Sequence, residues 1–141
     1  QQAWHLARGP RVLLARLRLD GVTGPLDAIP FVELPTLGGG TFLRGYDFAR
    51  FRDRVAAVGT LQYGWSVSHL IDAYAFTDAG RVYSSLDDLT PSGMRVGFGL
   101  GVQLHSDNSF LVDLSLASSI DGGAFVTASF NPIFDARPRW R

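Results

Sequence analysis

The strongest constraint on the fold is an alternation of apolar residues with small or polar residues that recurs along the chain. The clearest instance covers 94–104, where Met94, Val96, Phe98, Leu100, Val102 and Leu104 alternate with Arg95, Gly97, Gly99, Gly101 and Gln103. Successive side chains of a β-strand point to opposite faces, so this pattern predicts a strand with one apolar face. Similar strands are predicted at 12–22, 55–67, 69–83, 110–119 and 124–134, and a piece of strand at 1–6. With no useful helical period anywhere, we expect an all-β protein.

The second face of these strands indicates what surrounds them. Each strand has about ten residues, the length that crosses a membrane in a β-barrel. Arg16, Arg18 and Asp20 share one face, which indicates water there rather than a core. Glycines at 97, 99 and 101 would weaken an ordinary solvent surface, so they indicate that something packs closely against the wall. These features favour an antiparallel transmembrane β-barrel. The alternative is a soluble sandwich or lipocalin-like barrel whose apolar stripe faces inward.

Composition limits the classes of function. The 141 residues amount to one domain, and a net charge of zero gives no electrostatic argument for a nucleic-acid partner. There is no Cys for a zinc site or a disulfide scaffold. The histidines His5, His69 and His105 lie far apart, and no spacing typical of a catalytic triad or a metal site stands out. We therefore expect no enzyme activity, no catalytic residues, no metal and no cofactor.

The longest interruption of the strand pattern is 23–52, which contains three consecutive glycines and then Thr41, Phe42, Leu43, Arg44, Gly45 and Tyr46. Three glycines in a row do not hold a regular element. Bulky side chains directly after them have little use in a solvated loop. The sequence predicts a long loop folded back into a cavity, with Arg44 as its anchor. The alternative is a surface loop whose aromatic side chains pack on their own base.

Two motifs carry a resemblance to a known family. Leu43, Arg44, Gly45 and Tyr46, followed by the segment Phe76, Thr77, Asp78, Ala79 and Gly80, resemble the C-terminal barrel region of the BamA/TamA-type outer-membrane assembly and two-partner-secretion transporter superfamily, the bacterial surface antigen family. Members carry a V/L-R-G-F/Y motif at the tip of a loop that folds into the barrel, and an F-x-D-x-G motif on the barrel wall. The resemblance covers residues from about 12 to 134.

The resemblance implies roles for individual residues. Arg44 would reach Asp78 on the inner barrel wall, with Phe76 and Gly80 in the same wall motif. Gln62 stands where members often have a second acidic residue, so a clamp of two carboxylates is not expected. Phe130 and Phe134 would belong to the aromatic signal of the last strand.

The resemblance also implies an architecture and a function. Family barrels have about 16 strands, and six strands cannot close one, so 1–134 is expected to be the C-terminal part of a larger barrel. Residues 135–141 form a basic tail. The rest of the barrel and any POTRA domains would lie upstream.

The expected function is insertion or translocation of client proteins without covalent catalysis. Alternatives are a barrel that anchors or conducts a fused upstream passenger domain, and a soluble β-sandwich binding module. The expected location is the bacterial outer membrane, in contact with its lipid, with an organellar outer envelope as the alternative.

Overall fold

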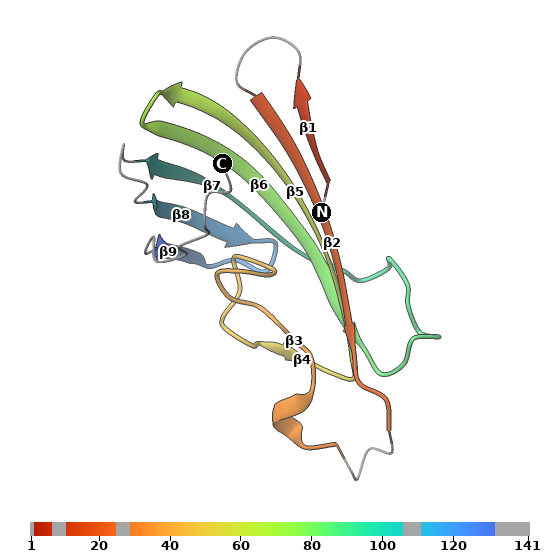
Figure 1. The fold of residues 1–141 in the computed structure, drawn as a ribbon. Coiled ribbons are helices and arrows are strands. Elements are labelled where there is room, and N and C mark those ends of the chain that lie inside the picture. Colours follow the sequence, from red (N-terminus) through yellow and green to blue (C-terminus); the bar gives the residue numbers. More distant parts are fainter. Residues whose placement is uncertain (1, 7–10, 25–28, 106–110, 132–141) are drawn as a thin grey trace, which may run out of the picture.

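One antiparallel sheet of seven strands dominates the structure, a computed structural model that describes residues 2–6, 11–24, 29–105 and 111–131 (Figure 1). The order of the strands is β1-β2-β5-β6-β7-β8-β9. Their bounds are β1 Gln2–Leu6, β2 Arg11–Gly21, β5 Val55–Ser68, β6 Ile71–Tyr83, β7 Arg95–His105, β8 Leu111–Ser119 and β9 Ala124–Asn131. The expected all-β fold is therefore present, and the segment at the start of the chain adds a seventh strand to the six predicted ones.

Two details differ from the sequence prediction. The β2–β5 connection is not wholly irregular, because it contains a short 3-10 turn, η2 (Phe31–Glu33), and a two-stranded ladder of β3 (Thr36–Leu37) and β4 (Phe51–Arg52). Two-residue strands are too short to produce a visible alternation. The strand predicted from 69 begins at Ile71, because residues 69 and 70 form the turn between β5 and β6. The register is irregular between Ser66 and Ser68 before this turn, and the Ser68 hydroxyl accepts a hydrogen bond from Leu70 N within it.

The register assigns every strand residue to one of two faces. We call the face that carries Asp78 the inner face and the one that carries Leu100 the outer face. Residues paired across the sheet share a face, so Thr60, Asp78, Gly97 and Ser119 form one inner rung. Tyr63, Ala75, Leu100, Leu116 and Val126 form an outer rung.

The two faces are packed in opposite ways. On the inner face Tyr74, Phe76 and Asp78 are buried. On the outer face Leu17 is 81% exposed and Val126 is 78% exposed. The apolar stripe is thus exposed, and no second sheet covers it within the described residues, which is the reverse of a soluble sandwich core. The outermost strands β1 and β9 each have one partner in the sheet, which is therefore open. No helix in the described part of the chain is long and apolar enough to cross a membrane.

The main apolar core lies between the β2–β5 connection and the inner face. It consists of Leu37, Leu43 and Tyr46 from the connection and Ala56 and Val58 from β5. Phe42, Phe51 and Val82 pack around it. In Figure 1 the segment that holds β3 and β4 lies on the hollow side of the curved sheet. The connection therefore fills the space that the sheet encloses.

The two long connections, β2–β5 and β6–β7, lie at the same end of the sheet (Figure 1). We call this the long-loop end, while β5 and β6 are joined at the other, the short-turn end. The short β8–β9 connection, 120–123, lies at the long-loop end as well, because β8 runs in the same direction as β6.

Candidate functional site

The candidate site is the contact between the loop tip, residues 38–50, and the inner face. Backbone hydrogen bonds close the tip on itself, from Gly38 N to Phe42 O at 3.2 Å and from Gly39 N to Tyr46 O at 3.1 Å. Leu43 has a positive φ of 56° and is fully buried, which is costly for a branched residue and persists only where packing enforces it. The tip is therefore a compact turn that presents its next residue, Arg44, to the wall.

Arg44 forms a two-pronged contact with Asp78 on β6. Its Nε donates to Oδ2 at 2.8 Å and its Nη2 donates to Oδ1 at 3.0 Å. The backbone N of Arg44 adds a third hydrogen bond to Oδ2, also 3.0 Å long. The Asp78 side chain is 0% exposed and that of Arg44 is 12% exposed. The pairing implied by the resemblance is thus present, with the main chain of the tip held by the same carboxylate.

The Phe76 ring supports the same guanidinium from one side. The Arg44 Cζ lies 3.4 Å from the centroid of this ring, and Phe76 is buried on the inner face two residues before Asp78. A guanidinium stacks well on an aromatic face while its edge binds a carboxylate. Both partners of Arg44 therefore come from the F-x-D-x-G motif.

The glycines of β7 provide the space for this contact. A Cβ at Gly97 would lie 1.7 Å from the carbonyl O of Arg44, so no other residue fits without moving the tip. At Gly99 a Cβ would lie 2.6 Å from the Phe76 ring, and at Gly101 it would lie 2.2 Å from the Tyr74 ring. Gly99 and Gly101 are paired in register with the two rings that need the room, Phe76 and Tyr74, whereas Gly97, opposite Asp78, leaves room for the backbone of Arg44. The close packing that the sequence indicated for these glycines is confirmed.

Gly45 and Tyr46 extend the contact toward β7 and β8. Gly45 has a φ of 93°, and a Cβ there would lie 2.2 Å from Ser118 O, so both backbone angle and space require glycine. The Tyr46 hydroxyl donates to Val96 O at 3.4 Å, and its ring packs edge-on against Phe51 at 5.2 Å. Burial raises the pKa of the Tyr46 phenol. At Gly80, the last residue of the wall motif, a Cβ would lie 3.2 Å from Leu37 Cδ1.

The tip also contacts the strands on either side of this centre. On β2 the Arg18 guanidinium lies over the Phe42 ring, 4.1 Å from its centroid. On β9 a Cβ at Gly40 would lie 3.0 Å from Thr127 Cγ2. One loop therefore crosses the inner face from β2 to β9, and the Arg44–Asp78 pair lies at the middle of that span.

The Arg44–Asp78 pair fixes the position of the loop tip on β6 rather than simply adding to stability. Removing two charges from water costs several kcal/mol, and the attraction between them offsets this cost only when the geometry is good. Here the carboxylate receives three hydrogen bonds and the guanidinium lies on a ring. Loss of one partner would leave the other charge buried alone, which costs about 3–5 kcal/mol. The pair can thus hold the loop tip in one place on the inner face.

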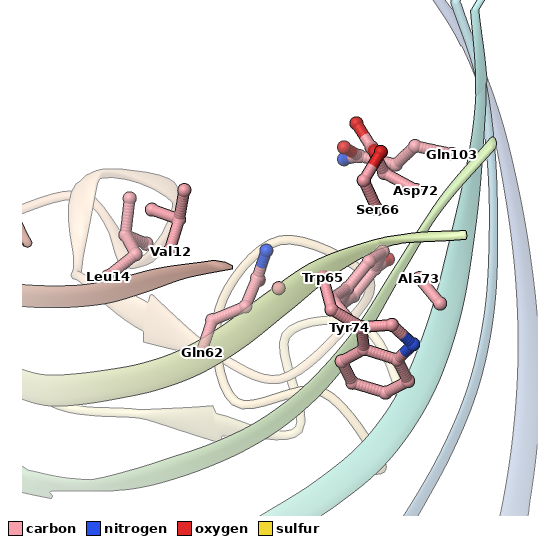
Figure 2. Close-up of a pocket in the computed structure, with 10 residues that line it drawn as sticks. Val12, Leu14, Gln62, Trp65, Ser66, Asp72, Ala73, Tyr74 and Gln103 are labelled. Atoms are coloured by element: carbon pink, nitrogen blue, oxygen red, sulfur yellow. The ribbon is translucent and has the colours of Figure 1, made fainter. Parts of the chain in front are cut away.

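Gln62, the fourth barrel-wall residue that the sequence singled out, does not join this cluster. It lines a hollow of about 450 Å³ on the inner face toward the short-turn end, together with Val12, Leu14, Ser66, Asp72, Tyr74 and Gln103 among others (Figure 2). In Figure 2 Ser66 and Asp72 lie on one side of the ribbon and the Trp65 indole on the other. The carboxylates of this region have local partners: Asp113 accepts from the Tyr74 hydroxyl at 2.6 Å and from Gln103 Nε2 at 2.8 Å, and Asp72 pairs with His105 Nε2 at 2.8 Å.

The other predicted residues lie apart from the tip. Phe130 is on the outer face of β9 and is 63% exposed. Phe134 and the tail 135–141 lie outside the described residues. Asp72 and Asp78, which share a strand face, bind different partners and do not form a pair. Within the described residues no cluster of three metal-ligating side chains occurs.

Sequence reasoning missed the stacking of Arg44 on Phe76, the Arg18–Phe42 contact and the bond from Tyr74 to Asp113. The only signal for the Arg44–Phe76 stacking was the glycine at 99, which is opposite Phe76 in the register.

In comparisons with known proteins, no family model matches this chain, and no curated protein matches it either.

Proposed function

We propose that this sheet is part of the wall of an outer-membrane β-barrel of the assembly and secretion type, which inserts or translocates client proteins without covalent catalysis. The observation that carries the proposal is the inside-out arrangement of the sheet, with an exposed apolar outer face and an inner face that buries an arginine-anchored loop. The outer face would contact lipid and the loop would occupy the lumen.

The distribution of charge on the outer face supports a lipid contact. Strands β2 and β5–β9 carry two charged side chains on the outer face, Arg11 and Arg81. Arg11 is in register with Trp65 and Ala73 near the short-turn end. Arg81 is in register with Ala57 and Leu19 near the long-loop end. Eight residue steps separate Ala73 from Arg81 on β6. At a rise of about 3.4 Å per residue this is about 27 Å along the strand, or about 20 Å along the membrane normal for a tilt of about 40°. An apolar band of about 25 Å is typical of outer-membrane barrels.

The open edges of the sheet support membership of a larger barrel. The hydrocarbon layer offers no hydrogen bonds to an unpaired strand edge, so a sheet in lipid has to close. We therefore assign the described sheet to a larger barrel whose other strands pair with the edges at β1 and β9. Those strands, with any POTRA domains, would be further partners of this region.

The position of the loop supports a role in handling polypeptides. The tip spans the inner face from β2 to β9, and β9 has one strand partner in the described sheet. At the seam where β9 meets the rest of the barrel, its edge can accept an extended client by backbone hydrogen bonding in place of the closing strand. A loop anchored by Arg44 and Asp78 and packed across the inner face can keep that edge ordered until a client engages it.

The test has two stages. First, membranes that contain the native protein are washed with carbonate, and its apparent size is compared with and without boiling. A retained species that is larger than this chain and migrates differently after boiling supports the barrel, whereas a soluble monomer contradicts it. Second, cells that carry Arg44→Ala are assayed for outer-membrane barrel proteins and for secreted proteins. Depletion of either group supports client handling and identifies which kind of client is used. Unchanged levels of both, with a stable barrel, contradict it and favour an anchor for a fused passenger.

A further inference from the structure

We propose that the outer face binds one anionic glycerophospholipid at the short-turn end, with an acyl chain in a hollow beside Trp65 and the phosphate at Arg11. This inference rests on the proposed membrane location. It adds a selective lipid site to what would otherwise be a uniform lipid contact.

The first observation is a hollow in an otherwise convex apolar surface. Its volume is about 430 Å³, within the range of small-ligand pockets. Its outer-face lining is apolar apart from the indole N–H of Trp65 and comes from five strands: Trp65, Ala73, Leu100, Val102, Leu114, Leu116 and Val126. The hollow exists because Ala73 on β6 is small while its neighbours in register, Trp65 and Val102, are large. An extended hydrocarbon chain is the ligand that fits such a surface inside a membrane.

The second observation is the cation next to this hollow. Arg11 on β2 is directly opposite Trp65 in the register, so its Cα lies two strand spacings, about 10 Å, from that of Ala73. Arg11 is exposed, and no described residue forms an ion pair or hydrogen bond with its side chain. By contrast, Arg81 at the long-loop end donates to Ser92 O. The short-turn end therefore presents an available guanidinium at the edge of the apolar band.

The third observation is a pair of aromatic side chains beside the hollow, of which Trp65 lies opposite Arg11 in the register. The Trp65 and Tyr63 rings lie 5.8 Å apart on the outer face of β5. Tryptophan and tyrosine are enriched at the level of lipid head groups, where the polar edge of the ring meets water and its body meets hydrocarbon. Trp65 therefore lies between the phosphate partner Arg11 and a chain site that extends one rung further into the apolar band, to Leu100 and Leu116.

The charge of the site selects among lipids. A guanidinium binds a phosphate through two parallel hydrogen bonds. In phosphatidylcholine the phosphate already has a cation in the same head group, whereas in phosphatidylglycerol it does not. We therefore infer a preference for the anionic lipid. One basic side chain at a membrane surface corresponds to about fivefold enrichment.

The test uses Trp65 as its own reporter in the reconstituted full-length protein. Vesicles contain equal amounts of phosphatidylglycerol and phosphatidylcholine, and bromine atoms, which quench tryptophan, are placed on the acyl chains of one lipid or the other. Total charge and composition are then identical in both samples. The Trp65 signal is the difference between the protein and Trp65→Phe. We expect Trp65 to sense about fivefold enrichment of the brominated anionic lipid over the brominated neutral lipid.

Three variants separate the parts of the site. Arg11→Gln should make the two lipids quench equally. Ala73→Leu fills the hollow and should lower quenching by the anionic lipid while Arg11 is intact. Ala79→Leu is the matched control, because Ala79 also lies on the outer face of β6 but does not line the hollow. This variant should change quenching by neither the anionic nor the neutral lipid. Equal quenching by both lipids in the unmodified protein would overturn the selective site while leaving the membrane location standing. Absence of Trp65 quenching by either lipid would overturn the membrane location itself.

Discussion

The two faces of this sheet follow opposite rules. The inner face carries most of the charged, polar and glycine residues of the sheet, together with apolar side chains that pack under the loop, and Asp78, Phe76 and Tyr74 are buried there. The outer face consists of Leu, Val, Ala and aromatic residues, and Leu100 on it is 61% exposed. In a water-soluble protein the apolar face would be covered and the polar face would be wet. The comparison teaches that the inner face is organised around one loop, while the apolar outer face stays uncovered within the described residues.

The largest expected effect is loss of the inner-face anchor. Arg44→Ala leaves the Asp78 carboxylate buried without a cation and should lower the free energy of unfolding by about 3–5 kcal/mol. Urea titration of the reconstituted protein measures this, and tryptic cleavage of the loop reports its release. Arg44→Lys should restore little, because an ammonium cannot make the two-pronged contact. Arg50→Ala is the control, since that side chain is 47% exposed and lies 3.9 Å from Asp47. Equal stability of the Arg44 and Arg50 variants would contradict the anchor.

The next largest effect is the cost in stability of an added arginine, which should differ between the two faces. Leu100→Arg places a cation in the outer band and should cost about 2–4 kcal/mol if lipid surrounds it. Gln62→Arg places the same charge in the inner hollow, which the Asp72 carboxylate also lines, and should cost much less. Folding yield into vesicles and the urea midpoint measure both. If Leu100→Arg is harmless, water rather than lipid covers the outer face.

A glycine on each face gives a smaller contrast. Gly97→Ala places a Cβ against the Arg44 carbonyl and should lift the loop tip, at a cost of about 1–3 kcal/mol. Gly59→Ala is the matched outer-face change, and the nearest atom to its Cβ would be Leu17 Cδ1 at 3.9 Å. Protection of the loop from trypsin should fall in the first variant and stay unchanged in the second. Unchanged protection in both would mean that the tip is not held against β7.

The smallest effect concerns Tyr46. Tyr46→Phe removes the 3.4 Å bond to Val96 O and should cost under about 1 kcal/mol near neutral pH. Because burial raises the pKa of Tyr46 above its ordinary value of 10.0, the unfolded chain loses this proton first. The contribution to stability is complete below pH 10 and declines as the pH rises through the folded pKa. Alkaline unfolding should therefore be less steep for Tyr46→Phe, and identical alkaline curves would contradict the buried phenol.

The sequence predicted the strands and their two faces because both depend on local alternation. The run from Val96 to Leu104 and its glycines was sufficient to place an apolar face and a closely packed one. The β3–β4 ladder was missed because two-residue strands have no period. The Phe76 stack was also missed, because it depends on which residue of a distant loop reaches the wall. Arg44 and Asp78 are 34 residues apart, and only a motif resemblance related them before the register was known.

The central claim is that lipid contacts the outer face and water contacts the inner face. It is tested most directly by measuring which of the two reaches each face. The chain has no cysteine, so single cysteines at 13–17 of β2 can carry a nitroxide label without interference. Collision of the label with oxygen, which concentrates in lipid, is compared with collision with a water-soluble nickel chelate in the reconstituted protein. The account predicts a period of two, with oxygen favoured at Leu13, Ala15 and Leu17 and nickel favoured at Leu14 and Arg16. Nickel access at all five positions would contradict it.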